Sequence, residues 1–195
     1  MLHAIYYKLS ALRYRFGLRK LGKGCQLRLG ARFIGGKYIS LDDNVILGTG
    51  AVFAVYPSFG GQDNPVKTDP NGGIIFGKRV SVNRNLTVYC ASRVEVEDDV
   101  LMGSGILITD NDHGTDPTAP DYRRQPLLTK PVKIGRGCWI GERAIILSGV
   151  EIGEHSIVAA GAIVKGSIPP YSIAAGVPAR VIKKWNFEKQ EWEKV

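Results

Sequence analysis

Large aliphatic side chains recur every six residues along the second half of the chain. One run continues without a break through Ile134, Ile140, Ile146, Ile152, Val158 and Val164. Small residues follow several of these positions, and a mostly small or β-branched residue stands four places after each. An α-helix repeats near 3.6 residues and a half-buried strand repeats every two residues, so neither explains this period. The pattern predicts a short strand followed by a sharp corner, repeated along the chain.

The same template occurs in the first half of the chain, with interruptions. Its large positions there are Leu29, Leu41, Leu47, Phe53, Phe76, Val82, Val96, Met102 and Ile108. Val82 and Val96 are 14 residues apart rather than 12, which predicts two extra residues bulging out of the register. Three strand-and-corner units would close a coil of about 18 residues, and such coils stack about 4.8 Å apart. We therefore expect an all-β parallel β-helix over residues 21–170; an irregular β-sandwich would keep so many regular hexads only by chance.

Three segments break the six-residue register. In residues 1–20, Ile5, Leu9, Leu12 and Phe16 recur at helical spacing among basic residues, which predicts a basic amphipathic helix. This helix would cap an open end of the coil, pack on a neighbouring subunit or touch a membrane surface. Residues 57–73 and 110–132 are rich in turn-forming residues, and loops of this length are usually functional or disordered. Residues 171–195 form a terminal extension, in which we expect a short helix from Lys183 to Val195.

Composition narrows the setting of the protein. Cys25, Cys90 and Cys138 lie far apart and form no CxxC pair, which favours a reduced cytoplasmic compartment over a disulfide framework. No run of about 18 apolar residues is present. The formal net charge of +8 suits an anionic partner such as a phosphorylated small molecule, an anionic lipid or a nucleic acid. The basic residues are dispersed and carry no nucleic-acid recognition motif, so we expect no nucleic-acid partner.

One of the three histidines stands where catalysis is plausible on chemical grounds. His3 and His155 have no motif around them and are best explained as solvated side chains. His113 follows the strand-like segment that ends at Thr109 and lies at the start of the second long loop. A histidine between a rigid coil and a loop is a candidate general base, since imidazole titrates near pH 6.5. A surface loop histidine without a catalytic role is the alternative.

Several segments, in order, resemble the hexapeptide-repeat acetyltransferases. They are Asp110 to His113 after a hexad strand, Trp139 with Ile140 and Gly141, the hexads of residues 146–164, and the stretch from Gly176 to Ile182. The sequence is most similar to the maltose/galactoside and polysaccharide O-acetyltransferase branch, over roughly residues 74–184. The resemblance implies a left-handed β-helix and acetyl-CoA as the acetyl donor, with no metal.

The resemblance also implies roles for individual residues. His113 matches the family's catalytic histidine, and Asn83 matches an active-site asparagine that bonds the acceptor or the oxyanion. The implied CoA-binding positions are Trp139, Gly141, Ala160, Lys165, Arg180 and Lys183. Basic side chains suit this ligand because CoA carries several negative charges. The family is trimeric with active sites between subunits, so His113 of one chain would face Trp139 and Ala160 of another.

The chain departs from the family pattern at three places. It has Tyr89, Cys90 and Ala91 where the sugar-acetylating branch has an acidic residue, Gly166 where that branch has a basic one, and an added loop at residues 57–73. These differences leave the acceptor open: a saccharide hydroxyl, the amine of an amino sugar, or a xenobiotic such as an antibiotic. A β-helix scaffold that has lost catalysis is a further alternative. Cys90 also remains a candidate acyl-carrying nucleophile, and Asp110, Asp112 or a backbone carbonyl could orient His113.

Overall fold

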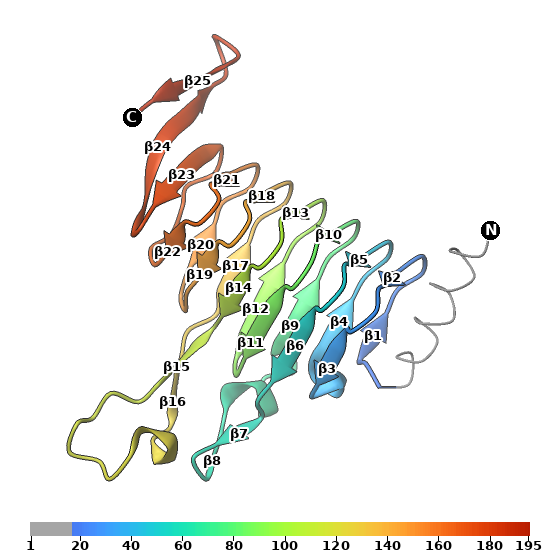
Figure 1. Cartoon of the computed structure of the whole chain (residues 1–195), viewed down its shortest axis with the longest axis vertical. Coiled ribbons are helices and arrows are strands. Elements are labelled where there is room, and N and C mark those ends of the chain that lie inside the picture. The colour runs from blue at the N-terminus through green and yellow to red at the C-terminus, as the bar shows by residue number, and fades with distance from the viewer. Residues whose placement is uncertain (1–16) are drawn as a thin grey trace.

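The computed structural model describes residues 17–195, which form a triangular stack of parallel strands (Figure 1). The helix predicted for residues 1–20 falls mostly on residues 1–16, outside the described part; residues 17–20 form a turn, a bend and the start of the first strand. Within residues 17–195, no helix is long and apolar enough to cross a membrane.

Three sheets form the sides of the stack. Sheet A contains, in spatial order, β1 (Lys20–Leu21), β4 (Ile39–Leu41), β9 (Gly73–Phe76), β12 (Arg93–Val96), β17 (Val132–Ile134) and β20 (Glu151–Ile152). Sheet B contains β2 (Gln26–Leu27), β5 (Ile46–Leu47), β10 (Ser81–Val82), β13 (Leu101–Met102), β18 (Trp139–Ile140), β21 (Ile157–Val158), β23 (Ser172–Gly176), β24 (Ala179–Asn186) and β25 (Glu191–Lys194). Sheet C contains β3 (Arg32–Ile34), β6 (Val52–Val55), β11 (Thr87–Cys90), β14 (Leu107–Thr109), β19 (Ile145–Ile146) and β22 (Ile163–Val164). The predicted all-β stack of parallel strands is confirmed.

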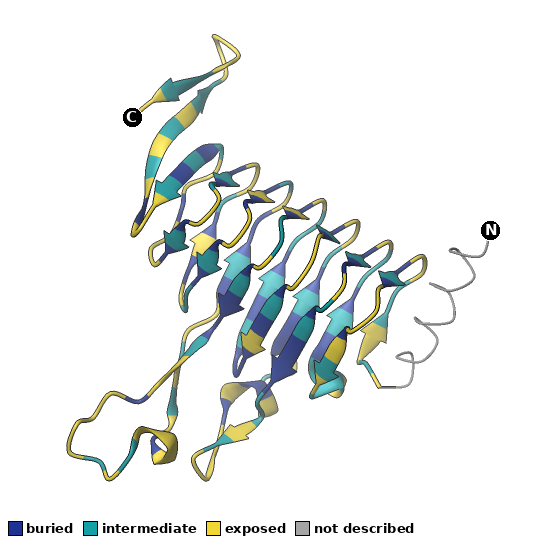
Figure 2. Ribbon diagram, viewed as in Figure 1, coloured by how far each residue is buried: buried dark blue, intermediate teal, exposed yellow. Residues whose placement is uncertain are grey.

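The strand register places each predicted aliphatic position directly over the next. On sheet B, Met102 pairs with Ile140 and Ile140 pairs with Val158. These side chains point inward and are at most 1% exposed. The interior is thus a column of large aliphatic and aromatic side chains. Figure 2 shows buried residues, in dark blue, recurring along the strands of successive coils. Each coil buries its own inward face only against its neighbours.

The first coil corrects one predicted position. Leu29 is 68% exposed, whereas Leu27 is fully buried. The next inward residue is Phe33, which lies in β3 and pairs with Phe53. Counting back from Leu41 in steps of six residues leads to Leu29. The true inward residue is Leu27, because the 3₁₀ helix η1 (Gly36–Tyr38) lengthens the corner after β3. The predicted bulge between Val82 and Val96 is confirmed, and it lies at the corner between β11 and β12, around Ala91 and Ser92.

Both long loops leave the stack at the corner where sheet C passes into sheet A, here called the C–A corner (Figure 1). The first arm, residues 56–72, contains the antiparallel pair β7 (Ser58–Phe59) and β8 (Gln62–Asp63) and the 3₁₀ helix η2 (Pro65–Lys67). The second arm, residues 110–131, contains β15 (Asn111–His113), paired antiparallel with β16 (Leu127–Thr129), and the 3₁₀ helix η3 (Tyr122–Arg124). The predicted loops are therefore ordered arms that project side by side.

The short helix predicted over residues 183–195 is wrong. This region continues sheet B as an antiparallel hairpin of β24 and β25. Trp185 pairs with Trp192 across the hairpin, and their rings lie 5.3 Å apart. Asn186 Oδ1 accepts hydrogen bonds from the backbone N–H groups of Glu188 and Lys189, which fixes the turn. A free strand edge at β23 offers backbone partners that override the helical preference of a short, charged segment.

The outward rows of the three sheets differ in character. On sheet A the register aligns Lys20, Ser40, Ile75, Glu95, Lys133 and Glu151. On sheet B it aligns Gln26, Ile46, Ser81, Leu101, Trp139, Ile157 and Ile173. On sheet C it aligns Arg32, Val52, Thr87, Leu107, Ile145 and Ile163. Sheet A therefore presents charges to solvent, while sheets B and C present largely apolar rows.

Candidate active site

His113 lies at the end of β15, where the second arm leaves the coil. It pairs with Leu127 of β16, and the base of the arm is closed by a hydrogen bond from the Lys130 N–H to the Asp110 carbonyl, 2.8 Å long. The imidazole is exposed and lies against the first arm, with its centroid 5.1 Å from that of Phe59. His113 therefore lies at the junction between the coil and the second arm, as expected from the sequence, but in a short antiparallel strand pair rather than in an irregular loop.

Asp110 anchors the base of this ladder. Its side chain is fully buried, and its carboxylate accepts hydrogen bonds from the backbone N–H groups of Ala91 and Ser92, at 2.8 and 2.7 Å. It also accepts from Asn111 Nδ2 at 2.8 Å and from Cys90 Sγ at 3.3 Å. The bulged corner between β11 and β12 thus supplies donors that satisfy a buried charge. The two extra residues near position 91 were the sequence signal for this corner, but its acidic partner was missed.

Neither nearby carboxylate reaches the imidazole. Asp110 is committed to the bulged corner, and Asp112 Oδ2 accepts a hydrogen bond from Ser148 Oγ at 2.8 Å. Among the described residues, the His113 ring packs against the ring of Phe59. Two of the three groups that could orient His113 are therefore engaged elsewhere.

Asn83 and Trp139 lie on a different part of the coil. Both line a shallow depression of about 520 Å³ on sheet B, beside Ser81, Leu101 and Glu142. Trp139 is 51% exposed in the outward row of that sheet. Asn83 begins the corner between sheets B and C, the B–C corner, and a Cβ on Gly48 in the preceding coil would overlap its carbonyl oxygen. Glycine at position 48 is thus needed for the backbone of Asn83 to pack.

The structure does not bring Asn83 and His113 together within one chain. Asn83 lies before β11 and the second arm leaves after β14, the next strand on sheet C. The width of that sheet separates the two corners, on the order of 15–20 Å for five to six extended residues. A site that uses both side chains needs a second copy of the chain.

The predicted CoA-binding residues are spread over three places. Gly141 and Ala160 lie at the B–C corner in successive coils, where a Cβ on Gly141 would lie 2.5 Å from the Ala160 nitrogen. Coil stacking alone therefore requires glycine at position 141. Lys165 is exposed just beyond β22, at the C–A corner.

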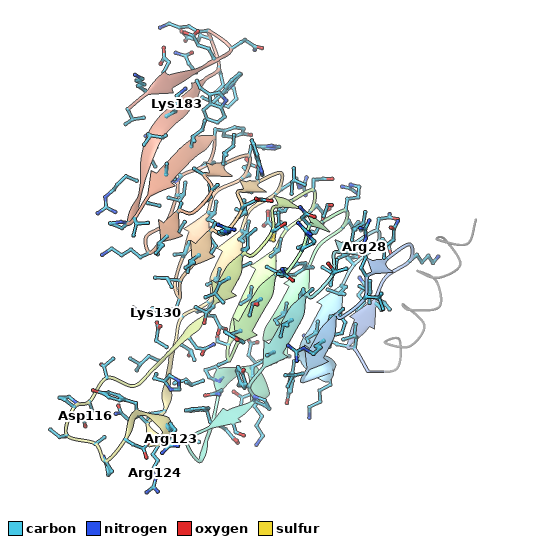
Figure 3. The ribbon with its side chains drawn as sticks, viewed as in Figure 1. Arg28, Asp116, Arg123, Arg124, Lys130 and Lys183 are labelled. Carbon is cyan, nitrogen blue, oxygen red and sulfur yellow. The ribbon has the colours of Figure 1, made fainter. Side chains whose placement is uncertain are left out.

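Arg180 and Lys183 lie on the terminal hairpin, in β24. Arg180 is exposed and Lys183 is half-buried opposite Lys194. Figure 3 shows Lys183 far from the arm that carries Arg123 and Arg124. Arg180 and Lys183 thus lie on the terminal hairpin, away from the arm that carries His113.

The thiols are poorly suited to nucleophilic chemistry. All three cysteines are buried. Burial, reinforced by the Asp110 carboxylate, raises the pKa of Cys90 far above its ordinary value. Burial raises the pKa of Cys138 to about 11, and its Sγ donates to the Gly153 carbonyl at 3.1 Å. Because the thiolate is the nucleophile, a neutral buried thiol disfavours an acyl-enzyme on Cys90. In residues 17–195, no group of three acidic, histidine or cysteine side chains is placed to hold a metal ion.

An aromatic cavity beside His113 was missed by the sequence analysis. It measures about 230 Å³ and lies between the two arms and the coil, lined by Tyr56, Phe59, Tyr89, Asn111, His113 and Leu127. The residues come from β11, the start of the first arm and both strands of the second. Their proximity depends on two insertions leaving the same corner, which sequence spacing does not reveal.

Comparison with known proteins finds the same repeat and a similar fold in acyltransferases. The family described as bacterial transferase hexapeptide (six repeats) matches residues 131–166. A protein of Escherichia coli (strain K12) named "Putative lipopolysaccharide biosynthesis O-acetyl transferase WbbJ" is 39% identical over 132 residues, which cover 63% of this chain. The match spans 66% of that relative, just under two thirds of its length.

Two solved structures share the fold. A galactoside acetyltransferase in complex with coenzyme A is 25% identical, with a TM-score of 0.62, and the match covers 93% of this chain and 74% of that one. The N-acyltransferase AntD from Bacillus cereus, in complex with dTDP and 3-hydroxybutyryl-CoA, has a TM-score of 0.74 at 22% identity; the match covers 94% of this chain and 91% of AntD. Together with the repeat, the likeness to the galactoside acetyltransferase implies the left-handed winding expected from the sequence. The chain therefore carries the hexapeptide repeat and is similar in sequence and fold to acetyltransferases that contain it.

Proposed function

We propose that this protein is an acetyl-CoA-dependent O-acetyltransferase that acts on a hydroxyl of a saccharide or glycan intermediate. The observation that carries the proposal is the position of His113, which is held on a short ladder at the edge of a small cavity. The names of the relatives supply the reaction class, since they include an O-acetyl transferase and a CoA-bound galactoside acetyltransferase.

The proposed reaction is direct transfer with His113 as general base. The imidazole takes the proton from the acceptor hydroxyl, and the oxygen attacks the thioester carbonyl carbon of acetyl-CoA. The C–S bond then breaks, and the CoA sulfur leaves with a proton, so the products are the acetyl ester and free CoA. The Asn83 amide would donate a hydrogen bond to the oxyanion that forms in between. The buried, neutral thiols support this route over an acyl-enzyme.

Acetyl-CoA would be held by Trp139, Gly141 and Ala160 near its pantetheine arm. Trp139 offers an exposed ring, and Gly141 and Ala160 keep the B–C corner free of bulky side chains. Lys165, Arg180 and Lys183 would meet the nucleotide phosphates. These residues fit the ligand in chemical type, because the set combines apolar surface with cations and contains no carboxylate.

We infer a homotrimer in which the site forms between neighbouring copies. Sheets B and C expose unlike, largely apolar rows, whereas sheet A exposes charged side chains. Contact between two different faces is heterologous, and such contacts close into rings when the rotation allows. In that ring, His113 of one copy would meet Asn83 and Trp139 of the next. We further propose a cytoplasmic protein, with residues 1–20 available for peripheral membrane contact.

Complementation between two inactive variants tests the proposal. His113→Ala and Asn83→Ala are each purified, shown to be inactive, then unfolded together at equal concentrations and refolded. In a random mixture about three quarters of the trimers are mixed, and each mixed trimer holds one intact site of three, so about a quarter of the wild-type activity should return. Each variant refolded alone is the control.

The outcomes separate the alternatives. If the mixture gains no activity while both variants refold to trimers, His113 and Asn83 do not share a site between copies. An acceptor panel with labelled acetyl-CoA, containing sugars, amino sugars and nucleotide sugars, tests the reaction class. Preferential N-acetylation of amines would replace O-acetylation as the function.

A further inference from the structure

The first arm is closed at its base by Asn64 and fixed to the coil by Val66. Asn64 is only 5% exposed; its Nδ2 donates to the Tyr56 carbonyl at 2.8 Å, and its backbone N–H donates to the Pro57 carbonyl at 2.9 Å. Val66 is buried, and its N–H donates to the Ala91 carbonyl at 3.0 Å. The arm therefore has a defined position on the bulged corner of the coil, and the side chains that it presents are positioned with it.

The tip of the first arm also packs on the second. Gly60 and Gly61 both have positive φ, and a Cβ on Gly60 would lie 2.9 Å from the Gln125 carbonyl oxygen. The Gln125 side chain is buried and makes two hydrogen bonds to the backbone of Asp116. Its Oε1 accepts from the Asp116 N–H at 3.0 Å, and its Nε2 donates to the Asp116 carbonyl at 2.9 Å. The two arms thus form one packed unit, and the cavity between them is part of the folded structure.

The cavity is small and carries no fixed charge. Its volume of about 230 Å³ lies below the ~300–1,000 Å³ of pockets for drug-sized ligands, so it suits a single sugar ring. Apart from His113, its lining side chains are uncharged. The neighbouring carboxylates of Asp110 and Asp112 bond the bulged corner and Ser148. A ligand with an ammonium group would therefore find no carboxylate partner in this lining.

Aromatic rings dominate the walls. Phe59 lies 5.1 Å from the His113 ring, and the Tyr56 and Tyr89 rings lie 6.2 Å apart. Flat apolar ring faces are complementary to the C–H face of a pyranose. Asn111 uses its Nδ2 on Asp110, which leaves its Oδ1 to accept a hydrogen bond from a ligand hydroxyl. Burial raises the pKa of Tyr56, so its hydroxyl remains a donor at neutral pH.

We propose that Tyr56, Phe59 and Tyr89 form an acceptor subsite that holds one uncharged pyranose ring with a hydroxyl directed at His113. This inference deepens the proposed function and rests on it for the reaction. In this subsite the first arm, with Tyr89, determines specificity and selects a neutral sugar over an amino sugar. Asn111 would align the ring through its free amide oxygen.

Steady-state kinetics on the full-length protein test the subsite. Phe59→Ala and Tyr89→Leu should each raise the KM for a neutral acceptor about 5- to 10-fold, because each removes an aromatic wall. The KM for acetyl-CoA should not change. Tyr122→Ala is the matched control, since Tyr122 is an exposed aromatic residue of the second arm that does not line the cavity. Thermal melting of each variant shows whether its fold is intact.

Binding measurements keep this test independent of turnover. Saturation-transfer NMR with methyl glucoside, methyl galactoside and methyl mannoside should show contact with wild type for at least one of them. That contact should be weaker with Phe59→Ala and unchanged with Tyr122→Ala. Glucosamine is the charged counterpart, and we expect it to bind more weakly than the neutral glycosides.

The results distinguish a failure of the subsite from a failure of the reaction. If transfer occurs and both wall variants keep the wild-type acceptor KM, the subsite is wrong and the proposed function stands. Tighter binding of glucosamine than of every neutral glycoside would overturn the preference for uncharged rings. If wild type binds a glycoside in the cavity but transfers acetyl to no acceptor, the subsite stands and the proposed function fails. No glycoside contact in the NMR experiment would also overturn the subsite.

Discussion

The uninterrupted coils of residues 131–166 and the C–A corner differ in how strongly the repeat constrains their sequence. In the uninterrupted coils every hexad repeats the same demand for an inward aliphatic residue, as at Ile140 and Ile146. At the C–A corner the chain inserts two arms of quite different sequence, and they carry His113 and the aromatic cavity. The family match falls on the first region. The second lies outside that match.

The difference shows why insertions at a corner are tolerated. The entropic cost of closing a loop rises only slowly with its length. The strands before and after the second arm, β14 and β17, keep their hexad pairing with the coils on either side. A corner can therefore acquire a binding surface without disturbing the frame, whereas a change within a coil affects the coils above and below it.

The largest effect should come from the arm and appear in activity rather than stability. His113→Ala should lower kcat by about 10²- to 10⁴-fold, the usual contribution of a general base, with little change in melting temperature. His155→Asn is the control, because His155 lies at another corner with φ of 53°, which asparagine tolerates. Retention of wild-type kcat by His113→Ala would exclude this histidine as the base.

A substitution within the coil should instead lower stability more than a substitution on the arm. Ile140→Ala removes a fully buried side chain from the central column and should lower the free energy of unfolding by about 2–5 kcal/mol. Leu128→Ala, at a position 51% exposed on the second arm, should change it by less than about 0.5 kcal/mol. Denaturant titrations measure both free energies of unfolding. A similar decrease in the two variants would contradict the view that the coil, and not the arm, carries the stability.

Asp110 joins the two regions, so its replacement should affect both. Asp110→Ala leaves the buried N–H groups of Ala91 and Ser92 without acceptors and should cost about 2–4 kcal/mol. Asp110→Asn keeps one acceptor oxygen and should cost less. Hydrogen exchange at residues 91 and 92 reports the effect directly. Unchanged protection of those two amides in Asp110→Ala would refute the anchoring role.

The smallest expected effect concerns alkaline pH and the uninterrupted coils. Burial raises the pKa of Cys138 from an ordinary value near 9 to about 11, so the folded state holds the proton more tightly than the unfolded state. This contribution to stability is complete below about pH 9 and is lost as the pH rises through about 11, amounting to roughly 2–3 kcal/mol. Cys138→Ser keeps a donor to Gly153 but does not ionise in this range, and should flatten that decline. An unaltered pH dependence in Cys138→Ser would assign the decline to other groups.

The repeat was predictable because the constraint is local and recurs. An inward position admits a large aliphatic residue in every coil, so spacing alone located most of the column. The prediction failed at Leu29, where the longer corner at η1 shifts the count, and in the terminal segment. In that segment Lys189 and Glu193 are four residues apart, a spacing at which an ion pair stabilises a helix. The two side chains do form an ion pair, but within the β24–β25 hairpin.

The site was predictable only in part, for a physical reason. The position of His113 next to a strand was visible in the sequence, because loop and strand signals are local. The contact of His113 with Phe59 joins two insertions separated by more than a whole coil, and nothing in either insertion specifies the other. The buried partner of Asp110 was hidden in the same way, since a backbone N–H group has no sequence signature.

The terminal hairpin has a consequence for how copies of this protein behave in concentrated solution. A stack of parallel strands ends in unpaired backbone groups that could accept another chain and grow into a fibre. Here sheet B turns back on itself through β24 and β25, and the outermost strand, β25, carries Glu191, Glu193 and Lys194. Charged side chains on an edge strand disfavour its pairing with another chain. The hairpin would thus disfavour end-to-end association of two chains through sheet B, while contacts between the sides of the coils would remain possible.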